Sequence, residues 1–363
     1  MTTADMTQRD YSLAGESTKR ALEIGLANAE WYRSTVGRKE LKELMQRSDT
    51  VAFRQSVLWI ALILGSAAGG IYFWSTWWCV PFFFVYGVLY GSSSDSRWHE
   101  CGHGTAFKTR WMNDVIYHIA SFMLMRNPVT WRWSHARHHT DTIVVGRDNE
   151  IAVPRPPSMT RIVINFIGLV DVWYSVPMLL KNAAGELSPA ELSFIPEQER
   201  PKAILAARVH VAIYLATIAA ALYFWSWLPL MLIGLPRMYG CWHMWMTGLL
   251  QHGGLADNVV DHRLNTRTVY MNPISRYLYW NMNYHIEHHM YPMVPFHALP
   301  RLHALIKDDL PAPNPSILAA YREMIGIFLK QRRDPEYFLK RPLPTTAQPY
   351  REFHPRGTAA AAQ

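Results

Sequence analysis

The sequence is poor in cysteine. Its 363 residues include only Cys79, Cys101 and Cys241, and no two of these form a CxxC pair. This pattern excludes a disulfide framework of the type found in small secreted proteins. The first 50 residues also lack the apolar core of a secretory signal peptide. We therefore expect the N-terminus to remain in the cytoplasm.

The sequence also lacks basic runs of the kind that bind nucleic acid. Lys and Arg total 36 against 28 Asp and Glu, which gives a formal net charge of +8. However, no basic stretch carries the interleaved aromatic residues of a nucleic-acid groove, so we expect no nucleic-acid partner. In a membrane protein this balance instead favours a basic cytoplasmic face close to anionic lipid.

Half of the residues are hydrophobic, and many of them lie in long runs. Residues 55–74 carry no charged side chain. A helix of that length can cross a hydrocarbon core of about 30 Å. Trp77 and Trp78 follow, as at a membrane interface, and a second apolar run extends to about residue 94. These runs predict a hairpin that crosses the membrane and returns.

Residues 204–225 and 228–247 predict a second hairpin, with Trp225 and Trp227 at its turn. Its return run leads to His252, as the first return run leads to His99, so both hairpins bring a histidine to a similar depth. Two further apolar stretches, 111–125 and 161–180, contain charged residues. All histidine motifs must reach one side of the membrane to share a site. We therefore expect 111–125 to lie along the interface or in the protein interior, and 161–180 to lie along the interface.

The predicted fold is an all-α integral membrane protein. Four transmembrane helices form two hairpins, accompanied by interfacial helices and a cytosolic, histidine-rich cap, with both termini cytoplasmic. We divide the chain into a solvated or interfacial cytosolic N-terminal segment (1–54), a four-span catalytic domain (55–307) and a polar, proline-rich C-terminal tail (308–363). The tail should contain one helix at 315–331 and end in a disordered stretch, 357–363. A bacterial inner membrane is favoured over the endoplasmic reticulum.

Histidine is abundant, with 16 residues, and it is clustered. The pattern HxxHH occurs twice, and HECGH is a shorter relative. Spacings of three and four residues place imidazoles on one face of a helix. Together with the isolated histidine of LLQHGG, the candidate metal ligands are His99, His103, His135, His138, His139, His252, His285, His288 and His289.

Neutral imidazole is a ligand for iron, copper, zinc and nickel, and this set exceeds the needs of one zinc ion. The pattern predicts two redox-capable ions, with iron the natural choice because its free positions can bind and reduce O₂. Arg237 and His243 are candidates to line a substrate channel, and His262 and His303 are expected at the surface. Acidic residues that could hold the outer nitrogens of the ligands are Glu100, Asp141, Asp148, Glu150, Asp257 and Glu287.

Two other classes of function fit parts of this pattern. HECGH matches the HExxH motif of zinc proteases, in which Glu100 would act as general base, but that motif accounts for only two of the histidines. The other class is a membrane protein that binds metal without catalysis.

Three stretches, HECGHGTAF, HARHHTDT and NYHIEHHMYPMVPFHALPRLH, resemble the histidine boxes of the membrane fatty acid desaturase and hydroxylase superfamily, with similarity over about residues 85–305. This superfamily includes desaturases, acyl hydroxylases, carotene oxygenases and alkane-type monooxygenases. The resemblance implies a cytosolic site with two iron ions and O₂ as oxidant. It also implies electrons from NAD(P)H that arrive through a separate ferredoxin, rubredoxin or cytochrome b5 with its reductase.

The implied reaction is abstraction of hydrogen from an unactivated C–H bond of a lipid or fatty-acyl chain, by a desaturase or a hydroxylase. A membrane monooxygenase that hydroxylates an alkyl or methyl group of a smaller substrate is the alternative. Acyl-CoA desaturases of animal type carry Asn four residues before the isolated histidine, whereas this chain has Gly248, so that detail does not transfer. The insert TDTIVVGRDNEIAVPRPPS is closer to bacterial hydrocarbon-oxygenase-like members.

Overall fold

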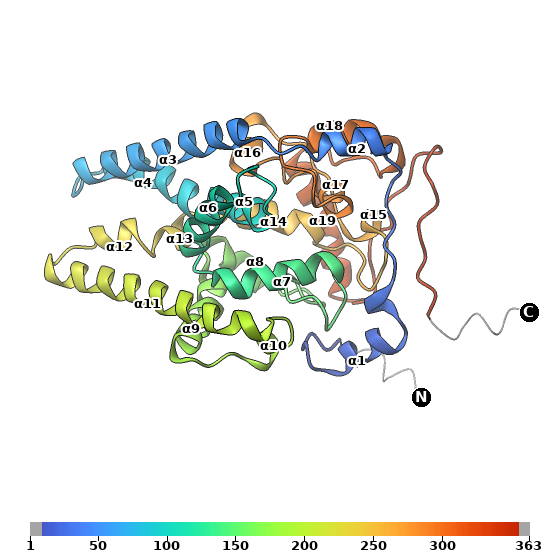
Figure 1. Cartoon of the computed structure of the whole chain (residues 1–363), viewed down its shortest axis with the longest axis horizontal. Helices are drawn as coiled ribbons and strands as arrows, with labels where there is room; N and C mark the ends of the chain where they lie inside the picture. Colours follow the sequence, from blue (N-terminus) through green and yellow to red (C-terminus); the bar gives the residue numbers. More distant parts are fainter. Residues whose placement is uncertain (1–8, 356–363) are drawn as a thin grey trace, which may run out of the picture.

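The computed structural model describes residues 9–355. Between these residues the secondary structure is helical, and β pairing is limited to two isolated bridges, Thr268 with Tyr284 and Val269 with Asn314. The stretch predicted to be disordered, 357–363, lies outside the described residues. The molecule is elongated: long helices project from one end, and the first and last described residues lie at the other (Figure 1).

The first projecting hairpin consists of α3 (Asp49–Tyr72) and α4 (Cys79–Val88). The side chain of Ser48 caps α3 by accepting a hydrogen bond from the Val51 amide at 3.4 Å. After α4, the chain continues through the π-helical turn η3 (Leu89–Ser93) into α5 (Ser94–Gly102), which carries the first histidine motif. The predicted hairpin is therefore present, and its return limb runs directly into the cap.

The second hairpin begins with α11 (Arg200–Tyr223), but its return limb is not one helix. It is broken into α12 (Leu228–Leu232), α13 (Pro236–Tyr239) and α14 (Trp242–His252). Gly234 has a φ of +94° and precedes Pro236, so the helix cannot continue through this point. The prediction of one continuous span over 228–247 was wrong.

Among residues 9–355, two single stretches of helix are long and apolar enough to cross a membrane, Arg38–Tyr72 and Glu197–Tyr223. A third candidate is a bent pair formed by α8 (Met159–Ile164) and η4 (Asn165–Ile167) with α9 (Leu169–Ala184). Its two parts meet at 75° around Gly168, which has a φ of +67°. The bend prevents one straight span over 161–180.

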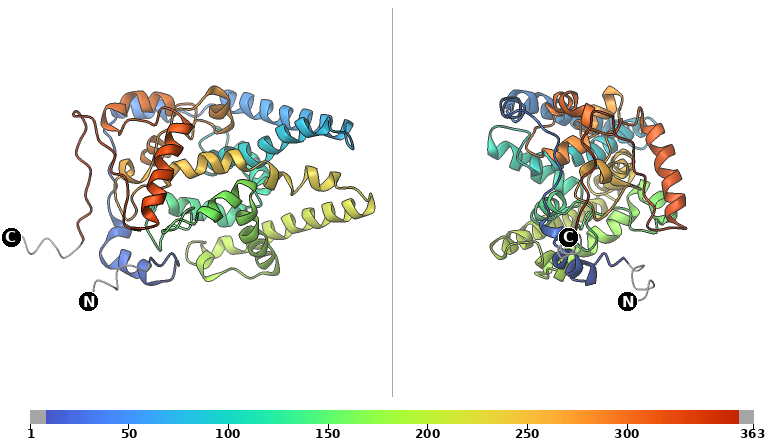
Figure 2. Two further views of the ribbon diagram at one scale, coloured as in Figure 1. Left: turned by 180° about the vertical axis from the view of Figure 1, so that it is seen from behind. Right: turned by 90° about the vertical axis from the view of Figure 1, so that its right-hand side faces the viewer.

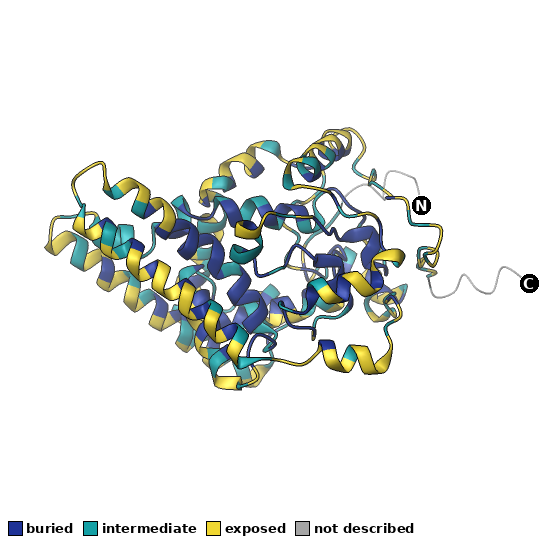
Figure 3. Ribbon diagram, turned by 90° about the horizontal axis from the view of Figure 1, so that it is seen from above, coloured by how far each residue is buried: buried dark blue, intermediate teal, exposed yellow. Residues whose placement is uncertain are grey.

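The projecting hairpins expose apolar side chains to their surroundings. Figure 3 shows exposed residues along them and buried residues concentrated in the body of the protein. Trp77 and Trp225, at the two hairpin turns, are each 90% exposed. Large exposed apolar side chains at one end of a folded protein are expected where lipid replaces water as the solvent.

The return limbs of the two hairpins touch backbone to backbone. A Cβ atom on Gly240, between α13 and α14, would lie only 1.8 Å from the carbonyl oxygen of Gly87 on α4. A Cβ atom on Gly91 would lie 2.4 Å from the carbonyl oxygen of Pro236. Glycine is therefore required at this crossing. The contact fixes α5 relative to α14, and these two elements carry His99 and His252.

The remaining helices build the cap around these limbs, as Figures 1 and 2 show. They are α1 (Glu16–Glu23), α2 (Arg38–Leu44), α6 (Arg110–Met123), α7 (Pro128–Thr140), α10 (Pro189–Leu192), α15 (His262–Asn265), α16 (Pro273–Leu278), α17 (His285–Met290), α18 (Leu299–Ile306) and α19 (Ile317–Gln331). The predicted tail helix at 315–331 corresponds to α19.

Both terminal segments pack against the cap instead of extending into solvent. In the N-terminal segment, Ser34 and Leu44 are each only 1% exposed. In the C-terminal tail, the carbonyl oxygens of Gln348 and Pro349 accept hydrogen bonds from the buried Arg263 at 3.0 and 2.8 Å. The sequence suggested that these polar segments are solvated, because hydrophobic periodicity does not reveal contacts with backbone groups and buried ions.

Candidate metal centre

The candidate ligands meet in two groups inside the cap. Within each group, one nitrogen of every ring lies within 4.8 Å of the corresponding nitrogens of the others. The first group has five histidines from α5, α7 and α17, with His103 at the end of α5, and the second has four from α7, α14 and α17. The first comprises His99, His103, His135, His139 and His288, and the second comprises His138, His252, His285 and His289.

Helices α7 and α17 each supply both groups, and they do so in opposite ways. On α7, the i and i+4 residues His135 and His139 join the first group, and the i+3 residue His138 joins the second. On α17, His285 and His289 join the second group and His288 joins the first. Three imidazoles on one helical face thus diverge enough to serve two centres about one turn apart.

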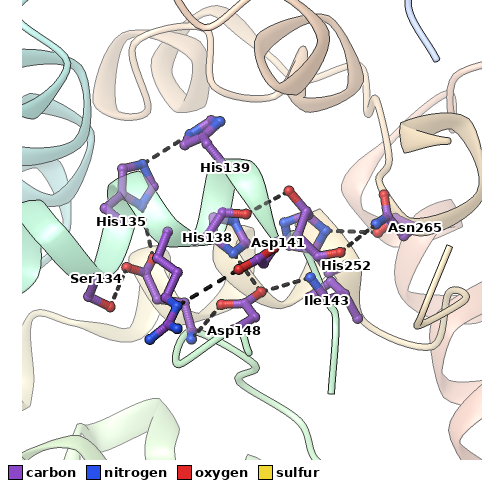
Figure 4. A network of polar contacts seen from close by, with 12 residues as sticks. Ser134, His135, His138, His139, Asp141, Ile143, Asp148, His252 and Asn265 are labelled. Atoms are coloured by element: carbon purple, nitrogen blue, oxygen red, sulfur yellow. Dashed lines mark hydrogen bonds and ion pairs between the residues drawn. The ribbon is translucent and has the colours of Figure 1, made fainter. Parts of the chain in front are cut away.

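Carboxylates and a carbonyl hold the outer nitrogens of three of these rings. Nδ1 of His138 lies 2.8 Å from Oδ2 of Asp148, and Nδ1 of His135 lies 2.9 Å from Oε2 of Glu150. Nδ1 of His252 donates to the carbonyl oxygen of Asn265 at 2.8 Å, as Figure 4 shows. These bonds place the proton on Nδ1 and leave Nε2 free to act as a ligand.

The inner nitrogens have no adequate partner in the protein. Nε2 of His252 is buried and makes no hydrogen bond among the described residues. Nε2 of His135 lies 3.2 Å from Nε2 of both His103 and His139, and Nε2 of His289 lies 3.1 Å from that of His285. Buried polar atoms that converge without partners are the pattern expected where a cation completes the site.

Burial keeps most of these rings in the neutral form that binds metal. It lowers the pKa well below the usual value for His99, His103, His139, His252, His285, His288 and His289. For His138, burial also lowers the pKa, but the negative charge and hydrogen bond of Asp148 outweigh it and the net shift is upward. Asp148 therefore offsets the effect of burial on the His138 ring.

The other candidate carboxylates bond elsewhere. Glu100 accepts hydrogen bonds from the Thr105 hydroxyl at 2.7 Å and the Phe296 amide at 3.0 Å, and burial raises its pKa to about 7. Asp141 pairs with Arg147 at 2.9 Å. These two acidic side chains hold the loops around the centre and not its rings.

Asp257 and Glu287 also hold other groups. Asp257 pairs with Arg9, which joins the N-terminal segment to the cap. Glu287 lies on α17 between ligand candidates, but its carboxylate accepts from the Thr268 hydroxyl at 2.6 Å and pairs with the ring of His303. The closeness of these acidic residues to the histidine motifs in the sequence did not indicate which groups their side chains contact.

His262 and His303 are not surface residues, so that prediction was wrong. They are 2% and 6% exposed. The ring of His262 lies 5.1 Å from that of His289, centroid to centroid, and stacks on Trp31 at 4.3 Å. Both histidines come from short helices of the cap, α15 and α18, whose polar sequences gave no sign of burial.

Arg237 and His243 lie apart from the open space beside the centre. Arg237 is buried, pairs with Asp171 at 2.5 Å and donates to the Leu124 carbonyl oxygen at 3.2 Å. This pairing explains how an arginine is tolerated inside an apolar run. Nε2 of His243 lies 3.2 Å from the Ser275 hydroxyl. Neither residue lines the adjoining cavity.

A cavity of about 420 Å³ adjoins both groups of histidines. Rings of both groups form part of its wall, and Gly248 on α14 faces it with no atom within 4 Å of where a Cβ would be. The remaining wall is mixed: apolar and aromatic side chains share it with charged ones such as Asp95, Arg126 and Asp171. The apolar and aromatic residues include Trp98, Trp131, Ile143, Ile162, Met244, Trp245 and Leu249. An elongated apolar molecule in this space would lie against the inner nitrogens.

Comparison with known proteins decides which family has this arrangement. Residues 75–320 match the family described as Fatty acid desaturase. The chain belongs to this family. The matched region contains every candidate ligand and most of the cavity wall, whereas α1, α2, α3 and residues 321–363 lie outside it.

Curated members of the desaturase family show limited similarity to the chain. An omega-6 fatty acid desaturase of the endoplasmic reticulum from Glycine max is 38% identical over 20% of each protein. A sn-1 oleoyl-lipid 12-desaturase from Synechocystis is 29% identical over 30% of each. A Delta(5) fatty acid desaturase from Caenorhabditis elegans is 25% identical over 58% of this chain and 53% of its own length. The chain thus matches between a fifth and about half of these relatives.

The family and the apolar helices together indicate a membrane protein. Two features describe the candidate centre of this desaturase-family chain. The first is the unequal division of five and four imidazoles, and the second is the open space at Gly248 beside the smaller group. No spacing rule in the sequence predicts either feature, because both depend on how α7, α14 and α17 converge.

Proposed function

We propose that this protein is an O₂-dependent di-iron oxidoreductase that removes hydrogen from an unactivated C–H bond of a fatty-acyl chain. The observation that carries the proposal is the pair of imidazole groups, of five and four rings, beside a cavity that is lined in part by apolar and aromatic side chains. Imidazole sites with positions left open for O₂ suit iron. The desaturases among its relatives act on fatty acids or acyl lipids according to their names.

The residues present fit two metal ions. Their inner nitrogens converge: Nε2 of His99 and of His252 makes no hydrogen bond among residues 9–355, and the other recorded contacts join one imidazole to another. Asp148, Glu150 and the Asn265 carbonyl oxygen hold outer nitrogens. The proposed ligands are the nine histidines of the two groups. Two iron ions held there would supply the oxidising power to activate O₂ and cleave a C–H bond.

The chain's own residues would bind and orient the substrate. Trp98, Trp131 and Met244 form an apolar wall that favours a hydrocarbon chain over water. Gly248 leaves room for that chain to pass close to the smaller histidine group. Asp95 and Arg126 pair at 2.6 Å on the cavity wall, which keeps their charges mutually satisfied next to the apolar space.

The zinc protease alternative would need Glu100 as its general base. Both hydrogen bonds of Glu100 Oε1 come from the Thr105 hydroxyl and the Phe296 amide, and Oε2 makes no hydrogen bond among residues 9–355. A protease would need this side chain to reach a metal-bound water. In a desaturase, the same hydrogen bonds of Glu100 would join the loop after α5 to the loop before α18.

We further propose that the cap lies in the cytosol and that four segments cross the membrane: α3, the limb from α4 to the start of α5 near residue 94, α11, and the limb from α12 into α14 as far as residue 247. His99 and His252 would then lie on the cytosolic side. The exposed tryptophans at the hairpin turns would lie at the far interface, and the broken return limb would be tolerated because its backbone packs against α4 and its Arg237 side chain pairs with Asp171. Electrons would come from NAD(P)H through a ferredoxin, rubredoxin or cytochrome b5 type carrier.

Metal content and product analysis test this function. Purified protein should bind two iron ions per chain, and His288→Ala or His138→Ala should abolish turnover while the protein stays folded. His354→Ala, in the C-terminal tail, is the matched control and should retain both iron and turnover. With ¹⁸O₂ and candidate acyl lipids, loss of two hydrogens without label means desaturation, and retained label means hydroxylation of the acyl chain or of a smaller substrate.

One zinc ion per chain with peptide hydrolysis would instead support a protease. Bound iron without O₂ consumption, in the presence of a reducing system and acyl lipids, would support a metal-binding protein without catalysis. Either result would contradict the proposed function.

A further inference from the structure

The structure joins the second histidine group to the surface of the cap through two stacked rings. Trp31 stacks on His262 with centroids 4.3 Å apart and ring planes at 9°. The His262 ring lies 5.1 Å from that of His289, one of the four candidate ligands of the second group. Trp31 is half-buried, whereas His262 and His289 are 2% and 3% exposed. The three rings therefore connect the outside of the cap to the candidate metal centre.

We propose that Trp31 and His262 form the route by which electrons enter the metal centre. The inference rests on the proposed function, which requires one-electron reduction from an external carrier. In each transfer the carrier is oxidised by one electron and one ferric ion of the centre is reduced to the ferrous state, and no bond forms or breaks in the protein. Electron transfer slows steeply with distance, so closely spaced rings between the surface and a ligand give a favourable path.

The two rings are held in place by bonds to the body of the cap. The indole Nε1 of Trp31 donates to the Thr140 carbonyl oxygen at 3.0 Å, directly after the α7 histidines. The next residue, Tyr32, donates its amide to the Val260 carbonyl oxygen at 2.9 Å, two residues before His262. The segment around Trp31 is therefore fixed on both sides of the stacked pair, by α7 and by the loop before α15.

This route is separate from the cavity assigned to the substrate. Trp98 also reaches a candidate ligand, since its ring lies 5.2 Å from that of His135, and it contacts Trp131 in turn. However, both tryptophans line the cavity, whereas neither Trp31 nor His262 does. An electron carrier at Trp31 would therefore leave the substrate cavity unobstructed.

The test uses a photoreductant attached beside the proposed route, so it does not depend on the identity of the natural carrier. Arg33 is exposed and lies two residues after Trp31. In the full chain with Cys79→Ser, Arg33→Cys would be labelled with a ruthenium tris-bipyridine complex and the protein loaded with iron. After a laser flash with a sacrificial donor, the rate of ferric reduction would be followed by absorbance without substrate or O₂.

We expect Trp31→Leu to slow this reduction several-fold and Trp31→Phe, which keeps a ring, to slow it less. The matched control is Trp227→Leu at the far hairpin turn, which should leave the rate unchanged. Iron content and thermal unfolding of each variant would be measured first, so that a loss of folding is not read as a loss of transfer. Equal reduction rates in the Trp31→Leu variant and its parent would overturn the proposed route.

The two proposals fail in different ways in this experiment. A protein that binds no iron contradicts the proposed function before any flash is given. A protein that binds iron and is reduced equally fast without Trp31 contradicts only the route.

Discussion

Oδ2 of Asp148 lies 2.8 Å from Nδ1 of His138 and also accepts a hydrogen bond from the Ile143 amide at 2.8 Å. One buried oxygen thus orients a candidate ligand and closes the loop that follows α7. His138 is the i+3 member of its motif and is the single residue of α7 that reaches the smaller histidine group. Its orientation therefore decides whether α7 contributes to that group at all.

Asp148→Asn should weaken metal binding without unfolding the protein. Asn keeps a carbonyl oxygen for the Ile143 amide but removes the charge that favours the Nδ1–H tautomer of His138. Loss of such a partner typically lowers metal affinity about 10- to 100-fold. The measurement is iron retention during titration with a chelator.

Asp141→Asn is the matched control for this change, because Asp141 is also a buried aspartate of the same loop but pairs with Arg147. It should retain iron as the parent protein does. If the Asp148 variant held iron as tightly as the control, the role given to this carboxylate would be wrong.

Asp309→Asn should lower the free energy of unfolding. Oδ2 of Asp309 accepts from the hydroxyls of Tyr32 and Ser34 at 2.7 and 2.6 Å, and Oδ1 accepts from Arg263 and from the Gln348 amide at 3.1 and 2.9 Å. An amide group can accept on one side only, so at least one donor is left unpaired, at a cost of about 1–3 kcal/mol. Thermal unfolding in detergent would measure the loss.

The neighbouring Asp308→Asn provides the comparison for this effect. Asp308 is exposed and only its backbone carbonyl accepts a bond, from Thr346. Its substitution should leave the unfolding temperature unchanged. An equal shift in both variants would mean that a general change of charge, and not the junction at Asp309, is responsible.

Gly240→Val should destabilise the protein by separating the two hairpins. A side chain there would overlap the Gly87 carbonyl oxygen on α4, and backbone cannot move aside as a flexible side chain can. The expected cost is about 1–3 kcal/mol or more. Gly326→Ala on α19 is the control, because it has no atom within 4 Å of its Cβ position and replaces glycine inside an exposed helix. Its unfolding temperature should stay the same or rise.

Gly248→Leu should block substrate while leaving the metal centre intact. The new side chain would extend into open space on the cavity wall, so folding and iron content should be retained. Turnover of an acyl substrate should fall by about tenfold or more, the scale of excluding a few carbon atoms from an apolar pocket. The check is turnover measured beside iron content, with Gly65→Leu on α3, where a Cβ also meets open space, as control. Unchanged turnover would place the substrate elsewhere.

The sequence was sufficient to predict the helical membrane class and the family, because those depend on local signals. Long apolar runs indicated α3 and α11, and the tail helix α19 was predicted almost to its bounds. The break at Gly234 and Pro236 was visible as residue types but was overridden in the prediction by the apolar character of the run. Hydropathy does not report backbone conformation, so it could not show that the helix breaks at Gly234.

The inner arrangement of the site depends on distant contacts and could not be read from spacing. Nothing near His262 in the chain indicates that Trp31 covers it, since these residues belong to segments far apart in the sequence. Similarly, the six acidic residues near the motifs looked equivalent, yet only Asp148 and Glu150 contact candidate ligands. Their direction depends on which loop each occupies once the helices have packed.

The division of α7 and α17 between both histidine groups has a consequence for how the centre fills. The first ion to arrive would fix the rotation of these two helices and thereby pre-orient the ligands of its neighbour. Binding of the second ion would then cost less conformational entropy, because α7 and α17 are already ordered. Metal uptake should therefore be cooperative, with few chains holding a single ion at half saturation.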